Sequence, residues 1–141
     1  SPELAASIVG REVIGETYTK VLLASSICLG VLSEVRAGAS SGDLITSRTF
    51  NIPGCGAFML HERNKESVRY FKEDQEAAFF DSPEELASKV RFYLEHPDRR
   101  LQMAQAGRAR CLTSGYSLDA RMGKIVKWLG GQVSASEKEN V

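Results

Sequence analysis

Three short, almost wholly apolar segments, alternating with segments of helical periodicity, most constrain the fold of this chain. They are Ile27–Leu32, Ala57–Leu60 and Ala77–Phe80. Apolar runs of about four to eight residues are typical of strands buried on both faces, as in parallel sheets. Intervening helices supply the crossovers that a parallel sheet needs. The sequence therefore predicts an α/β fold: a Rossmann-like parallel sheet with flanking helices.

The first half of the chain is expected to alternate helix and strand. Residues 12–14 are expected to add an edge strand, and Ser33–Asp43 to form a loop of small residues. The expected helices are Glu16–Ser26, a helix that begins within Leu44–Ser47 and ends near Pro53–Gly54, and a short helix over Ser67–Phe71.

The second half reads as three helices. In the first, Ser82 is the expected N-cap and Glu85 completes a capping box, with Leu86, Val90 and Leu94 on the buried face. This helix should end before His96–Pro97, because the residue ahead of a proline avoids helical geometry. Asp98 is expected to cap the second helix. The third should begin near Ser117, carry a single apolar stripe and end at Gly130–Gly131; the stripe is Leu118, Met122, Ile125 and Leu129.

A chain of 141 residues is long enough for one domain with a sizeable core. We expect residues 1–131 to form that domain and residues 132–141 to be a flexible C-terminal tail. The helix-and-strand pattern is already under way at Ser1, so the chain is expected to be the C-terminal part of a longer protein.

Composition excludes several classes of function. The chain has 18 Lys and Arg against 18 Asp and Glu, whereas a nucleic-acid-binding protein should carry a basic surplus. No apolar run approaches the ~20 residues of a membrane span. Cys28, Cys55 and Cys111 are odd in number and lack metal-ligand spacing, which argues against a metal site or a disulfide framework. They fit reduced thiols in a cytoplasmic protein.

The best candidate site lies where the loop after the first strand enters a helix. Ligands of open α/β sheets bind at the carboxyl ends of strands, and free amides at a helix start bind anions. Here the amides of residues 44–48 would meet a phosphate, with help from the side chains of Thr46, Ser47 and Arg48. The alternative is an ordinary N-cap at Asp43 or Thr46 with a solvated Arg48.

Two other motifs are weaker candidates. Gly54-Cys55-Gly56 ends a helix and precedes a strand, the reverse of a dinucleotide-binding fingerprint, so we interpret it as a helix C-terminus. His61-Glu62-Arg63 follows a strand and could line the same cleft, although a histidine between charged residues is more often a surface hydrogen-bonding group.

Several segments, in one order from Val13 to about Leu129, resemble the donor-binding C-terminal domain of family-1-type glycosyltransferases, specifically the spore-maturation-protein (CgeB-like) branch. They are Gly15–Tyr18, Thr46–Leu60, His61–Arg63, Glu76–Phe80, Pro83–Leu86, Ala106–Arg108 and Ser114–Ser117.

The resemblance implies a GT-B enzyme, with two Rossmann-like lobes, that transfers a hexosyl group from a nucleoside diphosphate sugar to an unknown acceptor without a metal ion or other cofactor. It implies that Leu44, Ile45, Thr46, Ser47 and Arg48 bind the diphosphate. Asp43 and Asn51, eight residues apart, stand where related families have glutamates for the sugar and the ribose. Without an N-terminal lobe the chain is expected to be inactive. The alternative is a non-catalytic module that keeps the fold for protein contacts.

Overall fold

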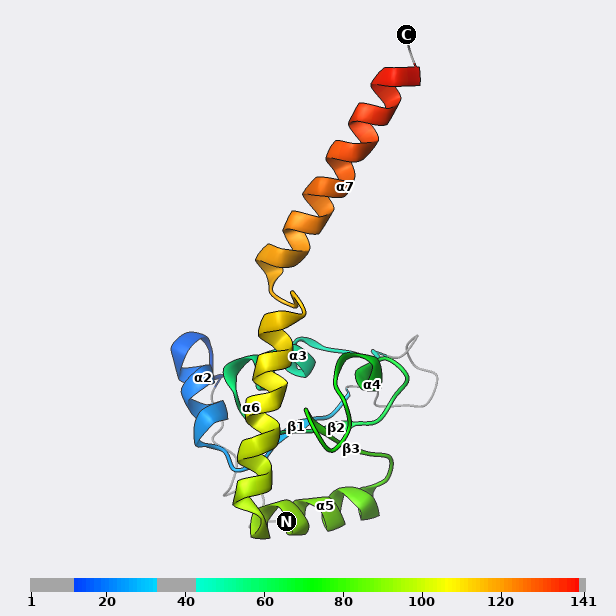
Figure 1. The fold of residues 1–141 in the computed structure, drawn as a ribbon. Helices are drawn as coiled ribbons and strands as arrows, with labels where there is room; N and C mark the ends of the chain where they lie inside the picture. Colours follow the sequence, from blue (N-terminus) through cyan, green and yellow to red (C-terminus); the bar gives the residue numbers. More distant parts are fainter. Residues whose placement is uncertain (1–11, 33–42, 140–141) are drawn as a thin grey trace.

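The computed structural model describes residues 12–32 and 43–139, with side chains up to residue 130. Most of the predicted loop Ser33–Asp43 lies outside the described residues. Three parallel strands form the sheet in the order β1-β2-β3, with helices on both faces (Figure 1). The strands are β1 (Cys28–Gly30), β2 (Met59–Glu62) and β3 (Ala78–Phe80). Leu29 pairs with Leu60, and Leu60 with Ala78. The predicted α/β, Rossmann-like class is confirmed.

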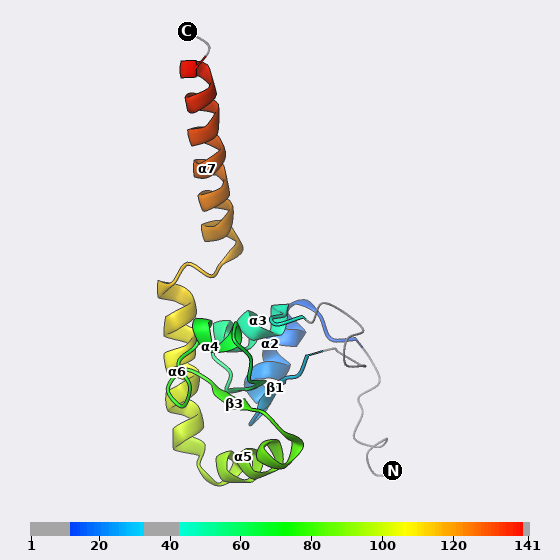
Figure 2. The same cartoon turned by 90° about the vertical axis from the view of Figure 1, so that its right-hand side faces the viewer.

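Six helices surround or extend from this sheet in the described part of the chain. They are α2 (Gly15–Ala24), α3 (Ser47–Cys55), α4 (Ser67–Tyr70), α5 (Pro83–Glu95), α6 (Pro97–Thr113) and α7 (Leu118–Glu139). Helices α2 and α3 lie on one side of the sheet and α5 on the other, while α6 runs along both layers (Figures 1 and 2).

Side chains that alternate along the strands fill two cores. Met59 and Phe79 point to the core under α2 and α3, with Leu22 and Ile52 from those helices. The second core lies on the opposite face of the sheet, where side chains of the sheet pack with side chains from α5 and the first half of α6. Its members are Phe58, Leu60, Ala78 and Phe80 from the sheet side, Tyr93 from α5, and Met103 and Ala104 from α6. Both faces of β2 and β3 are therefore covered, as the apolar runs predicted.

The first strand differs from its prediction. It spans three residues rather than Ile27–Leu32, and Leu29 is 41% exposed. Helix α5 packs on β3, and the described residues cover the Leu29 side chain on β1 only in part. Residues 12–14 form no strand, so the predicted edge strand is wrong.

The capping predictions are right about position and partly wrong about the groups involved. Ser82 Oγ accepts the Glu85 N–H at 3.1 Å, but the Glu85 carboxylate accepts the N–H of Asp81 instead of Ser82. Helix α6 begins one residue before the predicted cap Asp98, because Pro97 has the fixed φ of a first helical residue and His96 becomes the N-cap. On α5, Tyr93 is buried and Leu94 is 53% exposed.

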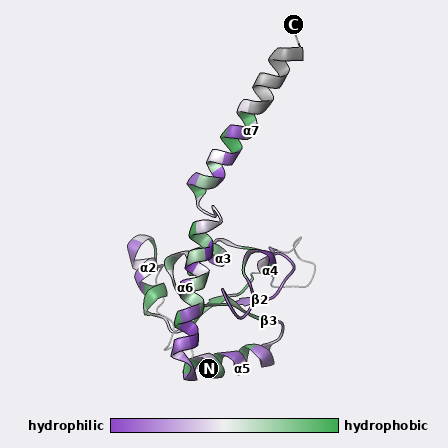
Figure 3. Cartoon of the chain, in the orientation of Figure 1, coloured by the Kyte–Doolittle hydropathy of each residue, from purple (hydrophilic) through white to green (hydrophobic). Residues whose placement is uncertain are grey.

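Helix α7 is the largest departure from the sequence-based expectation. It continues to Glu139, beyond the predicted end at Gly130–Gly131. Gly130 does not adopt the left-handed conformation that a glycine C-cap requires, and a helix tolerates an interior glycine at about 1 kcal/mol. The helix stands away from the sheet, and its stripe of Leu118, Met122, Ile125 and Leu129 is 49–80% exposed (Figure 3).

No helix among the described residues is both long and apolar enough to cross a membrane.

Candidate functional site

The candidate site is built around the start of α3, at the carboxyl ends of the strands. Thr46 is the N-cap and Ser47 the first helical residue, within the predicted range. Two contacts join this helix start to the strand ends, and a third joins the ends of β1 and β2. Arg48 Nη2 donates to the Val31 carbonyl at 3.2 Å, the Leu32 N–H donates to Glu62 Oε2 at 2.6 Å, and Asn64 Nδ2 donates to the Leu44 carbonyl at 2.8 Å. The ends of β1 and β2 and the entry to α3 therefore meet at one edge.

The backbone at this helix start leaves two amides available. The Thr46 N–H donates to Thr49 Oγ1 at 3.0 Å, and the Thr49 N–H donates to the Thr46 carbonyl at 3.1 Å. Ser47 and Arg48 are exposed, and their amides have no hydrogen-bond partner among the described residues. Because first-turn amides and the helix dipole both attract anions, this junction has the chemistry of an anion site.

The other predicted diphosphate residues lie on the same approach to α3. Leu44 and Ile45 are half-buried, and Asp43 is exposed at the edge of the described segment. Thr46 Oγ1 is buried and has no hydrogen-bond partner among the described residues, so its hydroxyl faces the interior rather than solvent. These residues form the approach to α3, with the Thr46 side chain turned inward.

Asn51 lies one helical turn beyond Ser47, on the same face of α3. It is exposed and lines a pocket of about 330 Å³ between α3 and the α6–α7 connection, with Phe50, Cys55 and Tyr116 among the other lining residues. Asn51 is therefore one turn from the available amides and borders a mostly apolar pocket.

Arg121 and Tyr116 hold the base of α7 beside this pocket. The Arg121 guanidinium lies 5.3 Å from the centre of the Phe50 ring, and the Tyr116 hydroxyl donates to the Tyr70 carbonyl at 3.2 Å. These contacts anchor the start of α7 to α3 and α4.

His61 is fully buried, contrary to its interpretation as a surface group. Its ring contacts the Thr49 hydroxyl and the Glu62 carbonyl. Burial lowers the pKa of His61, because an imidazolium loses its hydration there, and the neighbouring Glu62 opposes this only in part.

The lowered pKa predicts that stability decreases on acidification. An unfolded histidine binds a proton near pH 6.5 while folded His61 resists it, so the unfolded state binds more protons below that pH. The free energy of unfolding should decrease as pH falls below about 6.5, by at most ~1.4 kcal/mol per pH unit from this group. Urea titrations at pH 7.5 and 5.5 would measure it. His61→Gln should reduce the loss, whereas His96→Gln, at an exposed histidine, should retain it.

Arg63, the third residue of this motif, is held by carboxylates rather than free for a ligand. It pairs with Glu73, with Asp81 at 2.7 Å and with Glu85 at 3.6 Å. The hydrogen bond to Glu73 is the main cause that raises the pKa of Arg63. Lys89 joins the cluster 2.9 Å from Glu85. The cluster ties the ends of β2 and β3 to α5.

The cysteines are poor candidates for a nucleophile. All three are free, and burial raises the pKa of Cys28 and raises that of Cys111 to about 11. Both thiols are therefore protonated at neutral pH. No group of three or more His, Cys, Asp or Glu that could hold a metal ion occurs in the described part of the chain.

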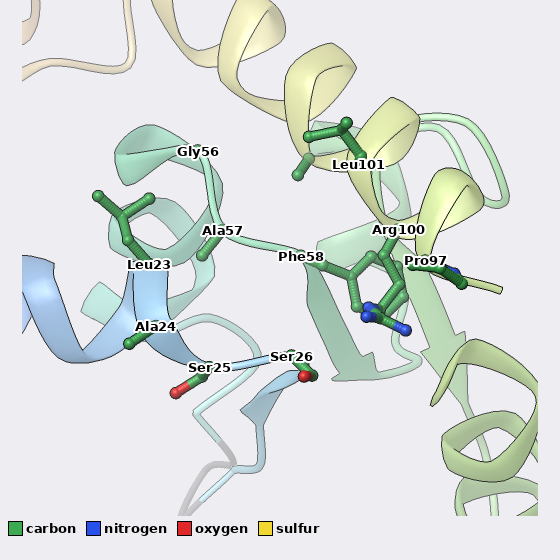
Figure 4. Close-up of a pocket in the computed structure, with 11 residues that line it drawn as sticks. Leu23, Ala24, Ser25, Ser26, Gly56, Ala57, Phe58, Pro97, Arg100 and Leu101 are labelled. Atoms are coloured by element: carbon green, nitrogen blue, oxygen red, sulfur yellow. The ribbon is translucent and has the colours of Figure 1, made fainter. Parts of the chain in front are cut away.

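A second pocket lies at the opposite, amino ends of the strands (Figure 4). It has a volume of about 280 Å³ and is lined by Ser25, Ser26, Phe58 and Arg100, among others. The Arg100 guanidinium donates to the carbonyls of Tyr93 and Leu94, so it caps the end of α5. Because open α/β sheets bind ligands at the carboxyl edge, the junction at α3 is the better candidate.

Sequence reasoning missed two residues that organise this edge. Asn64 holds the approach to α3 through a side-chain hydrogen bond, and Thr49 joins α3 to β2. The spacing Thr46-x-x-Thr49 at a helix start is the signal that could have identified Thr49, because a side chain at the third helical position often accepts the N-cap amide.

Comparison with known proteins finds one match, to a family model. No curated protein and no solved structure matches the chain. A model of the glycosyl transferase-like family matches residues 3–127. The match includes the sheet, the junction at α3 and helices α2 to α6. The chain therefore belongs to the glycosyl transferase-like family.

Proposed function

We propose that this chain is the C-terminal, donor-binding domain of a CgeB-like GT-B glycosyltransferase and that it binds a nucleoside diphosphate sugar. The observation that carries the proposal is the start of α3, at the carboxyl edge of a parallel sheet. Ser47 and Arg48 are exposed there, and their amides have no hydrogen-bond partner among the described residues. Membership of the glycosyl transferase-like family supports a nucleoside diphosphate sugar as the ligand whose diphosphate meets these amides.

In this proposal the diphosphate lies over the backbone of residues 44–48. Arg48 contributes its charge beside the Val31 carbonyl that it already contacts. Preorganised amides at a helix start stabilise a leaving diphosphate as negative charge develops on it, with no need for a metal ion.

Asp43 and Asn51 would bind the two ends of the donor. From Asp43 to Asn51 the chain passes through the N-cap and the first turn of α3, so the two residues flank the available amides. Asp43 would contact the sugar, and Asn51 would accept a hydrogen bond from the ribose. An amide gives up the charge-assisted hydrogen bonds that a glutamate makes, which is worth about 1–3 kcal/mol. We therefore expect a weaker donor affinity than a glutamate would give.

The full enzyme would transfer a hexosyl group to an acceptor bound by an N-terminal lobe. The described residues form a single three-stranded sheet with its helices, which corresponds to one lobe of such an enzyme. We propose that it is inactive alone and that its partners are the donor, the acceptor and that lobe.

Titration calorimetry with UDP, GDP and their sugars, with and without Mg²⁺, tests donor binding. We expect saturable binding of one nucleotide series without Mg²⁺. Arg48→Ala should weaken it at least about ten-fold, because a charge-assisted contact to phosphate contributes ~1.5–3 kcal/mol.

Arg69→Ala is the matched control for this titration. Arg69 is an exposed cation on α4 that pairs with Glu66, and its loss should leave nucleotide affinity unchanged. Equal weakening by both substitutions would indicate a general effect of charge and would contradict a specific site at α3.

The alternative function is a non-catalytic module that keeps the glycosyltransferase fold for protein contacts. Asn51 in place of a glutamate and the exposed apolar stripe of α7 favour it. Absence of binding by every nucleotide would support this alternative over the donor-binding domain.

A further inference from the structure

A chain of hydrogen bonds through two buried side chains connects the start of α3 to the centre of the sheet. The Thr46 N–H donates to Thr49 Oγ1 at 3.0 Å, and Thr49 Oγ1 lies 2.9 Å from His61 Nε2. His61 Nδ1 lies 2.7 Å from the Glu62 carbonyl oxygen. Thr49 and His61 are both 0% exposed. The first turn of α3 is therefore joined to β2 by polar groups that water does not reach.

The chemistry of these groups fixes the direction of every hydrogen bond. A carbonyl oxygen only accepts, so His61 Nδ1 carries the proton and donates to Glu62. In the neutral ring, Nε2 is then an acceptor, and the Thr49 hydroxyl donates to it. The oxygen of that hydroxyl is left to accept the Thr46 N–H. Each group is satisfied in a single arrangement.

The surroundings hold the imidazole in place. A Cβ atom on Gly30 would lie 2.2 Å from His61 Cδ2, so β1 packs directly on one side of the ring. Phe79 on β3 lies on the other side, with ring centres 6.2 Å apart. The charged groups that act on the ring are Glu62 on its own strand and Arg48 on α3. A fixed ring gives Thr49 a fixed partner.

We propose that Thr49 and His61 are positioning residues of the diphosphate site. Their hydrogen bond sets the backbone orientation of residues 46–48 and so aims the amides of Ser47 and Arg48 outward. The inference rests on the proposed function, because the ligand is the diphosphate of the donor. Neither side chain touches the ligand, since both are buried.

Isosteric substitution of Thr49, with nucleoside diphosphate binding as the readout, tests this inference. The nucleotide is UDP or GDP, whichever the wild-type chain binds. Thr49→Val keeps the shape of the side chain and removes the hydroxyl, leaving the Thr46 amide and His61 Nε2 without their partner. Affinity should fall at least about five-fold, the equivalent of one lost hydrogen bond. Thr49→Ser restores the hydroxyl and should return affinity to within about two-fold of wild type.

Thr113→Val is the control. Thr113 is an exposed threonine on α6 whose hydroxyl donates to the Ala109 carbonyl at 2.9 Å, and its loss should leave affinity unchanged. Nitrogen NMR of the histidine rings supplies a second readout that needs no variant. It should show His61 with its proton on Nδ1 and an unprotonated Nε2 whose shift moves when the nucleotide binds.

The outcomes separate the two proposals. If folded Thr49→Val binds the nucleotide as tightly as wild type, or if the His61 proton is on Nε2, the positioning role is wrong and donor binding stands. If the wild-type chain binds no nucleoside diphosphate, the proposed function fails and the positioning role fails with it.

Discussion

Replacing Gly30 with alanine is expected to lower the free energy of unfolding by about 3 kcal/mol, at the upper end of the usual cost of overpacking. The new methyl group would lie 2.2 Å from His61 Cδ2 and 2.7 Å from Cγ. Movement of the ring costs hydrogen bonds, because Thr49 and the Glu62 carbonyl hold its two nitrogens. The strand or the ring must shift, and either movement disturbs the start of α3.

Urea unfolding of Gly30→Ala beside Gly54→Ala measures this effect. Gly54 is an exposed helical glycine with no atom within 4 Å of the added methyl group, so its substitution should be neutral or stabilise the chain by up to ~1 kcal/mol. A Gly30→Ala/His61→Ala double variant should be less destabilised than the sum of the two single changes. Additive effects would show that the two side chains do not compete for the same space.

Phe79→Ala is expected to cost about 3–5 kcal/mol, the usual loss for a buried aromatic ring. Phe79 is 0% exposed and sits in the core shared by the sheet, α2 and α3. Its ring also faces His61 edge to face. The loss should therefore lower both stability and any binding at the start of α3.

Phe92→Ala is the matched control for Phe79→Ala, because Phe92 is 46% exposed on α5. It should cost less than about 1 kcal/mol in the same denaturant titration. Equal losses of unfolding free energy from the two substitutions would contradict the placement of Phe79 inside the core and Phe92 at its surface.

The fold was predictable because its apolar runs and capping residues act locally. Ala57–Leu60 and Ala77–Phe80 predicted β2 and β3 to within two residues, and Ser82-Pro83 placed the start of α5. The errors arose where a pattern depends on a neighbour. Leu29 needs a helix over its face of the sheet to be buried, and the described residues leave it 41% exposed.

Helix α7 carries the predicted apolar stripe, but its predicted end at Gly130–Gly131 is wrong. The stripe from Leu118 to Leu129 has the spacing of a packed helix, but its side chains are exposed. Periodicity shows that a helix has an apolar face and does not show what covers that face.

The start of α3, where we propose the site, was predictable in position and not in detail. The rule that ligands bind at strand carboxyl ends located the start of α3, and the helix begins there. The inward turn of the Thr46 hydroxyl and the Thr49–His61 contact depend on how β2 lies beneath α3. Sequence spacing carries no information on that packing.

Amide NMR of the chain titrated with UDP or GDP tests the central claim most directly, because it reports which backbone groups meet the diphosphate. The account predicts that the amides of Ser47 and Arg48 show the largest shifts and that those around Ser25 and Arg100 stay unchanged. Shifts that cluster at the amino ends of the strands, with Ser47 and Arg48 unmoved, would contradict it.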